Sequence, residues 1–274
     1  MRIKDILIVI AILLLLIACT AKEDPLIFAT IPAEDAALTK KQWQPTMDYL
    51  STEIGRQIEL VTVSDYTATI EALKYGHADI GRLSVAGYVT AIDEGVAIEV
   101  FVTAVKEETG LPGYTAVLIA AAGTDTTDMS SLTFAFVDVG STSGYVVPSI
   151  YLEENSITPR ESMLAGSHQA VILAVRNGSV DIGATCTHRL EEAIKQGIID
   201  RDEIVVVWQS EIIPNVPIVF QSSMDQELKD KLRNAFLNMP QYLIEAIAVD
   251  ETHYVEARDE DYDPIRDIIH YQSQ

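Results

Sequence analysis

The chain has 274 residues, with 19 lysines and arginines against 41 aspartates and glutamates, so its formal net charge is −22. Hydrophobic residues make up 48% of the sequence, which is enough to bury a core and excludes disorder for the bulk of the chain. The acidity excludes nucleic acid as a partner, because phosphate backbones repel such a surface, and two cysteines cannot form a disulfide scaffold.

The N-terminal segment has the pattern of a bacterial lipoprotein signal. A short basic stretch precedes the apolar run Ile6–Ile17, whose twelve residues are too few to span a bilayer core of about 30 Å. The run ends in Leu16-Ile17-Ala18-Cys19, which resembles a lipobox, where the cysteine becomes the lipidated first residue. We expect residues 1–18 to be a signal peptide and 19–24 a lipidated tether. An ordinary signal peptide with an incidental cysteine is the alternative.

The part after the signal holds 17 basic and 40 acidic residues, a net charge of −23. Its only cysteine besides Cys19 is Cys186, which therefore has no intramolecular partner. Neither Cys-x-x-Cys nor His-Glu-x-x-His spacing occurs in the sequence. The sequence predicts no metal site and no cofactor.

Short buried strands alternate with amphipathic helices along the rest of the chain. Strands are predicted at 26–31, 58–63, 78–81, 98–105, 114–120, 132–137, 180–185 and 204–208, and helices at 43–54, 66–75 and 145–154. Ser64 or Asp65 is available as the N-cap of the second helix. This alternation indicates an α/β fold with mostly parallel sheets flanked by helices.

The chain repeats part of its sequence at a distance. Residues 66–81 match residues 168–183 at seven of sixteen positions, and both segments end in Asp-Ile-Gly. We therefore predict two lobes with the same local plan. Because ligands of open α/β sheets bind beyond the carboxyl ends of the strands, the lobes should enclose a cleft between them. Equivalent positions of the two repeats should line it, namely Tyr66 with His168 and Ser84 with Cys186.

The segment Ser141-Thr142-Ser143-Gly144 lies between the predicted strand 132–137 and the predicted helix 145–154. Hydroxyl groups, unpaired main-chain N–H groups and the helix dipole meet at such a helix start, which makes it a cradle for a small oxyanion. A helix that is merely well capped is the alternative.

Several motifs together resemble one known family over nearly all of the mature chain. They are Ser141–Pro148 (Ser-Thr-Ser-Gly-x-x-x-Pro), Gly166–His168, Val175–Asp181, Asp261–Arg266, the Tyr66 segment and the turn Pro214–Pro217. The family is that of the phosphate-, phosphite- and phosphonate-binding proteins of ABC transporters, a branch of the type 2 periplasmic binding proteins. The resemblance implies a two-lobed fold, with residues 25–104 and 216–274 in one lobe and 105–215 in the other.

The resemblance also implies a mechanism, site residues and partners. Ser141, Thr142, Ser143 and His168 would hold the oxyanion, Tyr66 would close from the other lobe, and Tyr88 occupies the position of a pocket tyrosine. Such a protein would be a monomeric, non-enzymatic, extracytoplasmic lipoprotein. It would bind no nucleic acid, touch the membrane only through its lipid, and deliver its ligand to the permease and ATPase subunits of an importer.

The sequence departs from the family pattern at two places. Ser84-Val85 stands where the family commonly has Gly-Pro, and Cys186 stands where many members have an aspartate. In aminophosphonate binders an acid near that place would pair with the ligand's ammonium group, which a neutral thiol cannot do. We therefore expect phosphate, phosphite or an alkylphosphonate rather than 2-aminoethylphosphonate. The alternative is that Cys186 packs as a small apolar residue without touching the ligand.

Other residues are expected to have lesser roles. The surface histidines are predicted to be His77, His188, His253 and His270, and Tyr114 is a secondary cleft candidate. Arg82 is expected near the cleft rim in a solvent-exposed salt bridge, and the alternative is that it supplies positive charge to the site. Two alternative functions remain open at this point. One is a hydrolase that uses Gly140-Ser-Thr-Ser-Gly144 with His168, although its central residue is Thr142 rather than the serine of a nucleophile elbow. The other is a ligand-sensing lipoprotein that signals through a separate partner.

Overall fold

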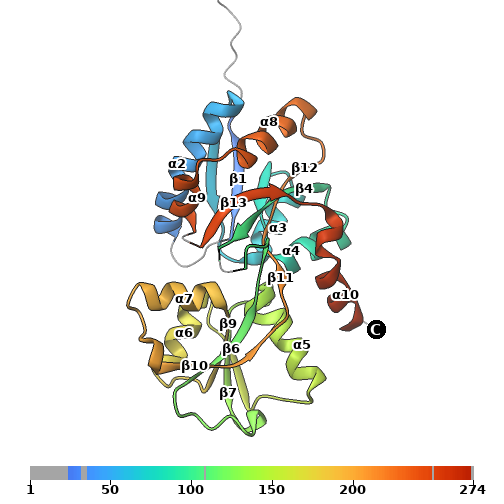
Figure 1. Ribbon diagram of the computed structural model, residues 1–274. Coiled ribbons are helices and arrows are strands. Elements are labelled where there is room, and N and C mark those ends of the chain that lie inside the picture. Colours follow the sequence, from blue (N-terminus) through green and yellow to red (C-terminus); the bar gives the residue numbers. More distant parts are fainter. Residues whose placement is uncertain (1–23, 32–35, 108, 249, 273–274) are drawn as a thin grey trace, which may run out of the picture.

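Two β-sheets, each covered by helices on both faces, divide the molecule into two lobes, one above the other in Figure 1. The computed structural model describes residues 24–31, 36–107, 109–248 and 250–272. The predicted signal peptide, the lipidation at Cys19 and most of the tether therefore lie outside the described residues. None of the helices within these ranges is long and apolar enough to cross a membrane.

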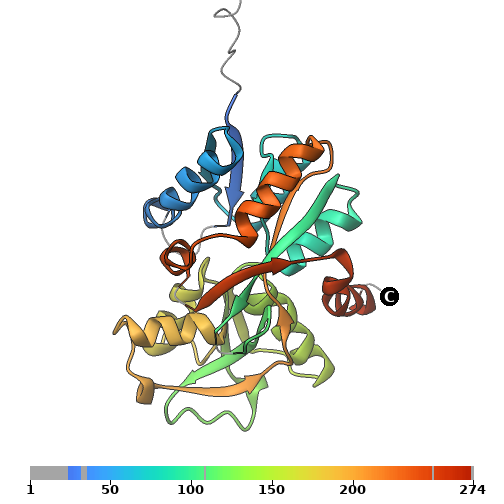
Figure 2. The same ribbon diagram turned by 45° about the horizontal axis from the view of Figure 1, so that its top comes forward.

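The first lobe is built on a six-stranded sheet. From edge to edge it consists of β13 (Glu251–Glu256), β4 (Ile98–Lys106), β12 (Pro217–Gln221), β3 (Ile80–Arg82), β1 (Leu26–Thr30) and β2 (Ile58–Thr62). One face is covered by α2 (Ala36–Ile54), α8 (Gln226–Leu237) and α9 (Gln241–Ile247). The other face is covered by α3 (Tyr66–Lys74), α4 (Val85–Asp93) and α10 (Asp263–Gln272), the last following the 3₁₀ turn η4 (Asp259–Tyr262). Figure 2 shows α8 lying over the sheet.

The second lobe has a five-stranded sheet. Its order is β10 (Ile204–Gln209), β6 (Ala116–Ala121), β9 (Ile182–Cys186), β7 (Thr133–Phe136) and β8 (Glu161–Leu164). One face packs on the π-helical turn η2 (Thr142–Val146) and α5 (Val147–Glu154), and the other on α6 (His168–Arg176) and α7 (Thr187–Lys195). Two 3₁₀ turns, η1 (Met129–Ser131) and η3 (Arg201–Glu203), complete the lobe.

The chain passes between the lobes twice, and the two passages pair with each other. β5 (Gly113–Tyr114) follows β4 on the way out, β11 (Ile213–Pro214) precedes β12 on the way back, and the two form an antiparallel ribbon. Two passages are what the lobe division implied by the family resemblance requires. The exact lobe boundaries at 104/105 and 215/216 stay a prediction.

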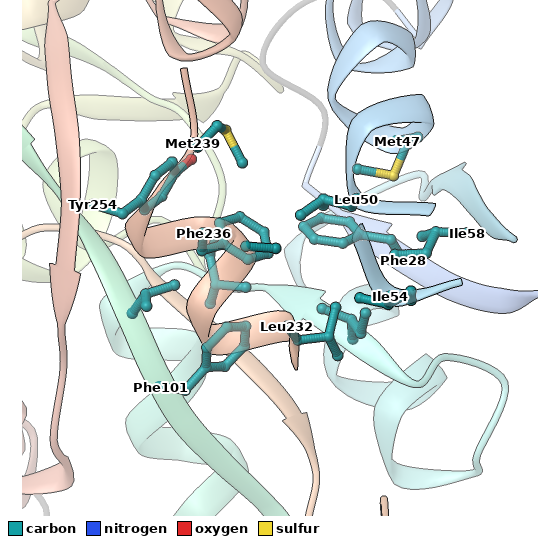
Figure 3. Packing of buried hydrophobic residues seen from close by; sticks show 14 of the residues in the cluster. Phe28, Met47, Leu50, Ile54, Ile58, Phe101, Leu232, Phe236, Met239 and Tyr254 are labelled. Carbon is teal, nitrogen blue, oxygen red and sulfur yellow. The ribbon is translucent and has the colours of Figure 1, made fainter. Parts of the chain in front are cut away.

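Each sheet buries alternate side chains on opposite faces, as the two-residue period of a strand requires. In the first lobe Phe28 packs toward α2, α8 and α9, whereas its neighbour Ala29 packs toward α3 and α4. Figure 3 shows the first of these clusters, in which Phe28 and Leu50 approach Leu232 and Phe236. Full burial on both faces accounts for the continuous apolar runs of the predicted strands.

The predicted repeat is confirmed in detail. The order β4-β12-β3-β1-β2 of the first sheet corresponds to β10-β6-β9-β7-β8 of the second. Asp79 accepts a hydrogen bond from the Ile27 N–H at 2.8 Å, and its counterpart Asp181 accepts one from the Thr133 N–H at 2.8 Å. The aspartate of Asp-Ile-Gly thus ties β3 to β1 in the first lobe and β9 to β7 in the second. The shared sequence therefore encodes the same β-α-β unit twice.

Several expectations about the elements need correction. The sheets are mixed rather than mostly parallel, since β1 pairs parallel with β2 and β3 but β12 pairs antiparallel with β3 and β4. The reason is that β12 returns from the second lobe and enters the sheet from its opposite end. Helix α2 begins at Ala36, not at Trp43, so that Pro45 lies inside it. The predicted strand 114–120 is divided between β5 and β6, and the alternation pattern did not predict β8, β12 or β13.

Candidate functional site

A small cavity lies where the carboxyl ends of the strands of the two lobes meet. Its volume is about 50 Å³, which is room for roughly three to five water-sized groups. The cavity is lined by Ile31, Tyr66, Arg82, Ser84, Tyr114, Ser141, Thr142, Ser143, His168, Cys186, His188, Arg189, Asn215 and Val216. The structure thus brings together seven of the eight predicted ligand-binding residues, all except Tyr88.

The start of the helix after β7 forms one wall. Ser141 is its N-cap, and its hydroxyl accepts a hydrogen bond from the Gly144 N–H at 3.1 Å. The first turn is π-helical, and the first main-chain N–H groups of a helix have no acceptor within it. Ser143 is nearly fully buried in the wall, with an exposed fraction of 3%. This wall therefore offers amide and hydroxyl donors and the positive end of a helix dipole.

Two hydroxyl groups at the rim link the lobes directly. The Ser84 hydroxyl, at the N-cap of α4, donates to the Gly140 carbonyl at 2.7 Å. The Thr142 hydroxyl accepts a hydrogen bond from the Ala86 N–H at 2.9 Å. Because both bonds cross the cleft, the structure is that of a closed protein.

Close backbone contact at the same rim explains the glycine before the hydroxyl segment. A Cβ atom added at Gly140 would lie 2.7 Å from the Cβ of Tyr66, closer than side chains pack. Tyr66 begins α3 in the first lobe, but it packs into the apolar cluster of the second lobe together with Ile31. Burial raises the pKa of the Tyr66 phenol above its ordinary value, so the group stays a neutral donor.

His168 begins α6 and is held from behind. Its Nδ1 lies 3.0 Å from the hydroxyl of Thr185, which is fully buried in β9. Burial lowers the pKa of His168 to about 3, and the nearby Arg189 guanidinium adds to the effect. The ring is therefore neutral at physiological pH. When Nδ1 accepts a hydrogen bond from the Thr185 hydroxyl, the proton of the neutral ring is on Nε2, which can then donate a hydrogen bond to a ligand.

Cys186, Tyr114 and His188 form a second wall. The thiol of Cys186 lies 3.5 Å from Nε2 of His188, and burial raises the thiol pKa to about 11, so it stays protonated. Tyr114 packs edge-on against the His188 ring with centroids 5.1 Å apart. The Nδ1 atom of His188 is buried and has no hydrogen-bond partner among the described residues.

No carboxylate lines the cavity among the described residues, but two guanidinium groups do. Arg189 of α7 pairs with Glu192 at 2.6 Å. Arg82 ends β3 in the first lobe and has no ion pair and no side-chain hydrogen bond within the described part of the chain. The cavity is therefore electropositive, although the chain as a whole carries a net charge of −22.

A buried charged network lies behind the cavity at the crossovers. Lys106 pairs with Asp250 and Glu251, each at 2.9 Å, and the Asn215 amide donates to the Ala104 carbonyl at 2.8 Å. Burial alone would raise the pKa of Glu251, but Lys106 and Arg82 outweigh it and hold that pKa below its usual range. The network keeps ionised groups at the point where the lobes meet.

Tyr88 does not reach the cavity, contrary to the sequence-based expectation. It is 1% exposed, its hydroxyl donates to Asp259 at 2.8 Å, and its ring packs edge-on against Tyr262. It lies one turn inside α4, about 6 Å along the axis from the cap residue Ser84 that does line the cavity. The side chain instead anchors the segment before α10.

Other corrections concern the cationic groups. His188 was predicted on the surface and lies in the cavity wall, because α7 starts directly after β9 and its second residue remains at the strand's carboxyl end. Arg82 lies at the cleft as expected, but the expected salt bridge is absent among the described residues, so its alternative role as a source of positive charge stays open. Arg189 and Asn215 were missed. Only their positions in the sequence could have indicated them: Arg189 lies three residues after Cys186, and Asn215 lies inside the turn Pro214–Pro217. His77, His253 and His270 are exposed, as predicted.

Comparison with known sequences gives one family. A profile described as "ABC transporter, phosphonate, periplasmic substrate-binding protein" matches residues 28–262. The "Phosphate-import protein PhnD" of Mycolicibacterium smegmatis is 28% identical over 223 residues, covering 76% of this chain and 70% of the relative. The "Phosphonates-binding periplasmic protein" of Escherichia coli is 28% identical over 228 residues, covering 79% of this chain and 67% of the relative.

Solved structures give the same fold. A binding protein component of an ABC phosphonate transporter from Pseudomonas aeruginosa is similar with a TM-score of 0.82 and 26% identity, over 92% of this chain and 87% of that one. PhnD1 from Prochlorococcus marinus, solved with methylphosphonate, is similar with a TM-score of 0.81 and 17% identity, over 90% and 98% of the two chains.

Proposed function

The chain belongs to the family of periplasmic substrate-binding proteins of ABC phosphonate transporters, and from that premise we propose that it is a lipoprotein that captures a small phosphorus oxyanion by closing its lobes. Members of this family bind substrates for importers and are not enzymes. The candidate ligands are phosphate, phosphite and a small alkylphosphonate such as methylphosphonate. The relatives named for phosphate import and for phosphonate binding support this range.

One observation carries the proposal. The helix start at Ser141–Ser143, the neutral ring of His168 and the phenol of Tyr66 line one cavity of about 50 Å³ between the lobes. All of these groups can donate hydrogen bonds, and the helix dipole adds partial positive charge at the same point. A small oxyanion has acceptors on every side, so the donors and the ligand are complementary.

Ligand capture proceeds by closure. The oxyanion docks first on the helix start of the second lobe, and Tyr66 then approaches it from the first lobe. The bonds from Ser84 to Gly140 and from Ala86 to Thr142 form in the same movement, since each joins the two lobes. Greater affinity of the ligand for the closed form shifts the equilibrium toward it. The importer's membrane subunits then receive the closed form.

The wall that contains Cys186 favours a ligand without an amino group. Cys186 lines the cavity, and its protonated thiol offers no negative charge to an ammonium group. Ile31 and Val216 add apolar surface to the lining. Phosphate, phosphite and methylphosphonate are therefore preferred to 2-aminoethylphosphonate.

Membrane attachment belongs to the same proposal. Cleavage before Cys19 and its lipidation would anchor the protein outside the cytoplasm, where it would act as a monomer beside the permease and ATPase subunits. A Cys19→Ala variant expressed from the full-length sequence should lose its lipid and move from the membrane fraction to the soluble fraction. Equal membrane retention of both proteins would refute the anchor.

Isothermal titration of the mature chain tests the binding function. Ser143→Ala and His168→Ala should each weaken the binding of methylphosphonate, phosphate or phosphite, whichever binds tightest, by about 1–3 kcal/mol, because each removes a buried donor. Ser179→Ala and His77→Ala alter exposed residues and are the matched controls. Unchanged affinity in both cavity variants would remove the site assignment.

A further inference from the structure

Arg82 differs from every other described arginine. Arg56, Arg160, Arg176, Arg189, Arg201, Arg233, Arg258 and Arg266 each have an ion pair or a side-chain hydrogen bond. Arg82 has neither within the described part of the chain. Acidic residues outnumber basic ones 41 to 19, so a surface arginine readily finds a carboxylate in this protein. An unpaired arginine therefore calls for another partner.

The position of Arg82 indicates where that partner belongs. The residue ends β3, is partly buried and lines the cavity. Its positive charge acts on Tyr114 and on His188, which line the same cavity, and it contributes to the low pKa of His188. The guanidinium group thus reaches across from the first lobe toward the walls formed by the second.

The nearby carboxylate of Glu251 accepts no hydrogen bond from the Arg82 guanidinium group. Glu251 is influenced by the charge of Arg82, but it accepts its hydrogen bonds from the Lys106 ammonium group at 2.9 Å and from the Asn215 amide at 3.3 Å. Glu251 therefore helps to offset the partly buried charge of Arg82, while the guanidinium N–H groups have no hydrogen-bond acceptor among the described residues. Such a fork matches the geometry of two oxygens on one phosphorus.

We propose that Arg82 selects the ligand by charge, supplying the first lobe's ion-pair partner to a doubly charged oxyanion. This inference rests on the proposed function, because it concerns the ligand of the same cavity. With Arg82 and Arg189 in the wall and no carboxylate there among the described residues, a second negative charge is stabilised. A ligand ammonium group would meet two positive charges without an acid to pair with.

Two ligands of the same shape separate charge from size. Methylphosphonate carries two negative charges at pH 8.5, whereas methanesulfonate carries one. Isothermal titration of the mature protein should give at least tenfold tighter binding of methylphosphonate. Equal affinity for the two ligands would overturn the inference without any variant, and a failure of all phosphorus oxyanions to bind would instead refute the proposed function.

Variants then assign the preference to Arg82. Arg82→Gln should weaken methylphosphonate binding on the order of ten- to a hundredfold and methanesulfonate binding much less, so that the ratio of the two affinities narrows. Arg82→Lys should retain most of the ratio because it keeps the charge. Arg201→Gln removes an arginine whose side chain is 69% exposed and should match the unmodified protein. An unchanged ratio in Arg82→Gln, or equal weakening of both ligands, would overturn the inference.

Discussion

Ser141, Thr142 and Ser143 are consecutive in the sequence but have different surroundings in the structure. The Ser141 hydroxyl caps the helix, the Thr142 hydroxyl bonds to the other lobe, and Ser143 lies buried in the cavity wall. All three line the cavity. The motif therefore indicated the place of the site, whereas the distinct contact of each hydroxyl depends on how the lobes meet.

Residues outside the motif show where sequence reasoning ends. Tyr88 lies one helical turn from a cavity residue and points into the core, while His188 is followed by charged residues and is nevertheless buried beside the cavity. The position of Tyr88 depends on the orientation of α4 relative to its sheet. The sequence of α4 does not contain that orientation, because a helix that is apolar on most of its surface fits in several rotations. The place of His188 depends instead on where β9 ends and α7 begins.

The two buried histidines predict a loss of stability in acid. The pKa of His168 is lowered to about 3, below its ordinary 6.5, and the pKa of His188 is also lowered. Above pH 6.5 neither folded nor unfolded protein binds these protons. As the pH falls below 6.5 the unfolded state takes them up first, which costs the folded state up to about 2 kcal/mol per histidine at pH 5.

Urea denaturation of the ligand-free protein at pH 7.5 and pH 5.0 measures this loss. His168→Gln removes one titrating ring and leaves the acidic surface unchanged. Between pH 7.5 and pH 5.0 the free energy of unfolding of this variant should therefore fall by about 1–2 kcal/mol less than that of the unmodified protein. An identical loss in the variant and the unmodified protein would mean that His168 is protonated in the folded state.

At the scale of elements, the repeated β-α-β unit was the most reliable prediction from sequence. The N-caps Asp65 and Ser167, the left-handed turns at Gly76 and Gly178, and the clamping aspartates all recur at equivalent places. These features are local, so a short sequence specifies them. Sheet order, the antiparallel returns of β12 and β6, and the strands β8 and β13 depend on contacts across the chain, and the alternation pattern did not reveal them.

The repeat also allows a matched pair of substitutions. A Cβ atom at Gly183 would lie 2.7 Å from both Val171 Cγ1 and Val175 Cγ2, whereas one at Gly81 would lie 2.6 Å from Leu73 Cδ1. Valine side chains are stiff and those of leucine are more adaptable. Gly183→Ala should therefore destabilise the protein by about 1–3 kcal/mol and Gly81→Ala by less. Denaturant midpoints measure both, and a larger loss at Gly81 would contradict this packing.

At the scale of the whole molecule, the net charge of −22 does not oppose an anionic ligand. Surface charges are screened within about 8 Å at physiological salt, and the cavity itself is lined by two arginines and no described carboxylate. Acidity of the outer surface and an electropositive cavity coexist because they occupy different regions. The overall composition therefore bears on solubility and excludes polyanions as ligands, whereas the residues that line the cavity determine which small ligand binds.

Closure should be measurable at Cys186. In a Cys19→Ala variant it is the one remaining cysteine, and it is 1% exposed in the closed structure with a thiol pKa of about 11. Alkylation by iodoacetamide therefore requires the lobes to open. Saturating methylphosphonate should slow the reaction at least fivefold, while the protein unfolded in urea should react at the same rate with or without ligand. Equal rates for the free and liganded folded protein would contradict closure around the ligand.

A thermal-shift panel of the mature protein tests the central claim most directly. Its ligands are phosphate, phosphite, methylphosphonate, 2-aminoethylphosphonate, sulfate and taurine. A ligand present at a hundred times its Kd adds about 2.7 kcal/mol, which corresponds to a rise in Tm of roughly 5 °C or more for a protein of this size. We predict that rise for at least one of the first three ligands and none for the last three. No shift with any of the first three, or the largest shift with 2-aminoethylphosphonate, sulfate or taurine, would contradict the account.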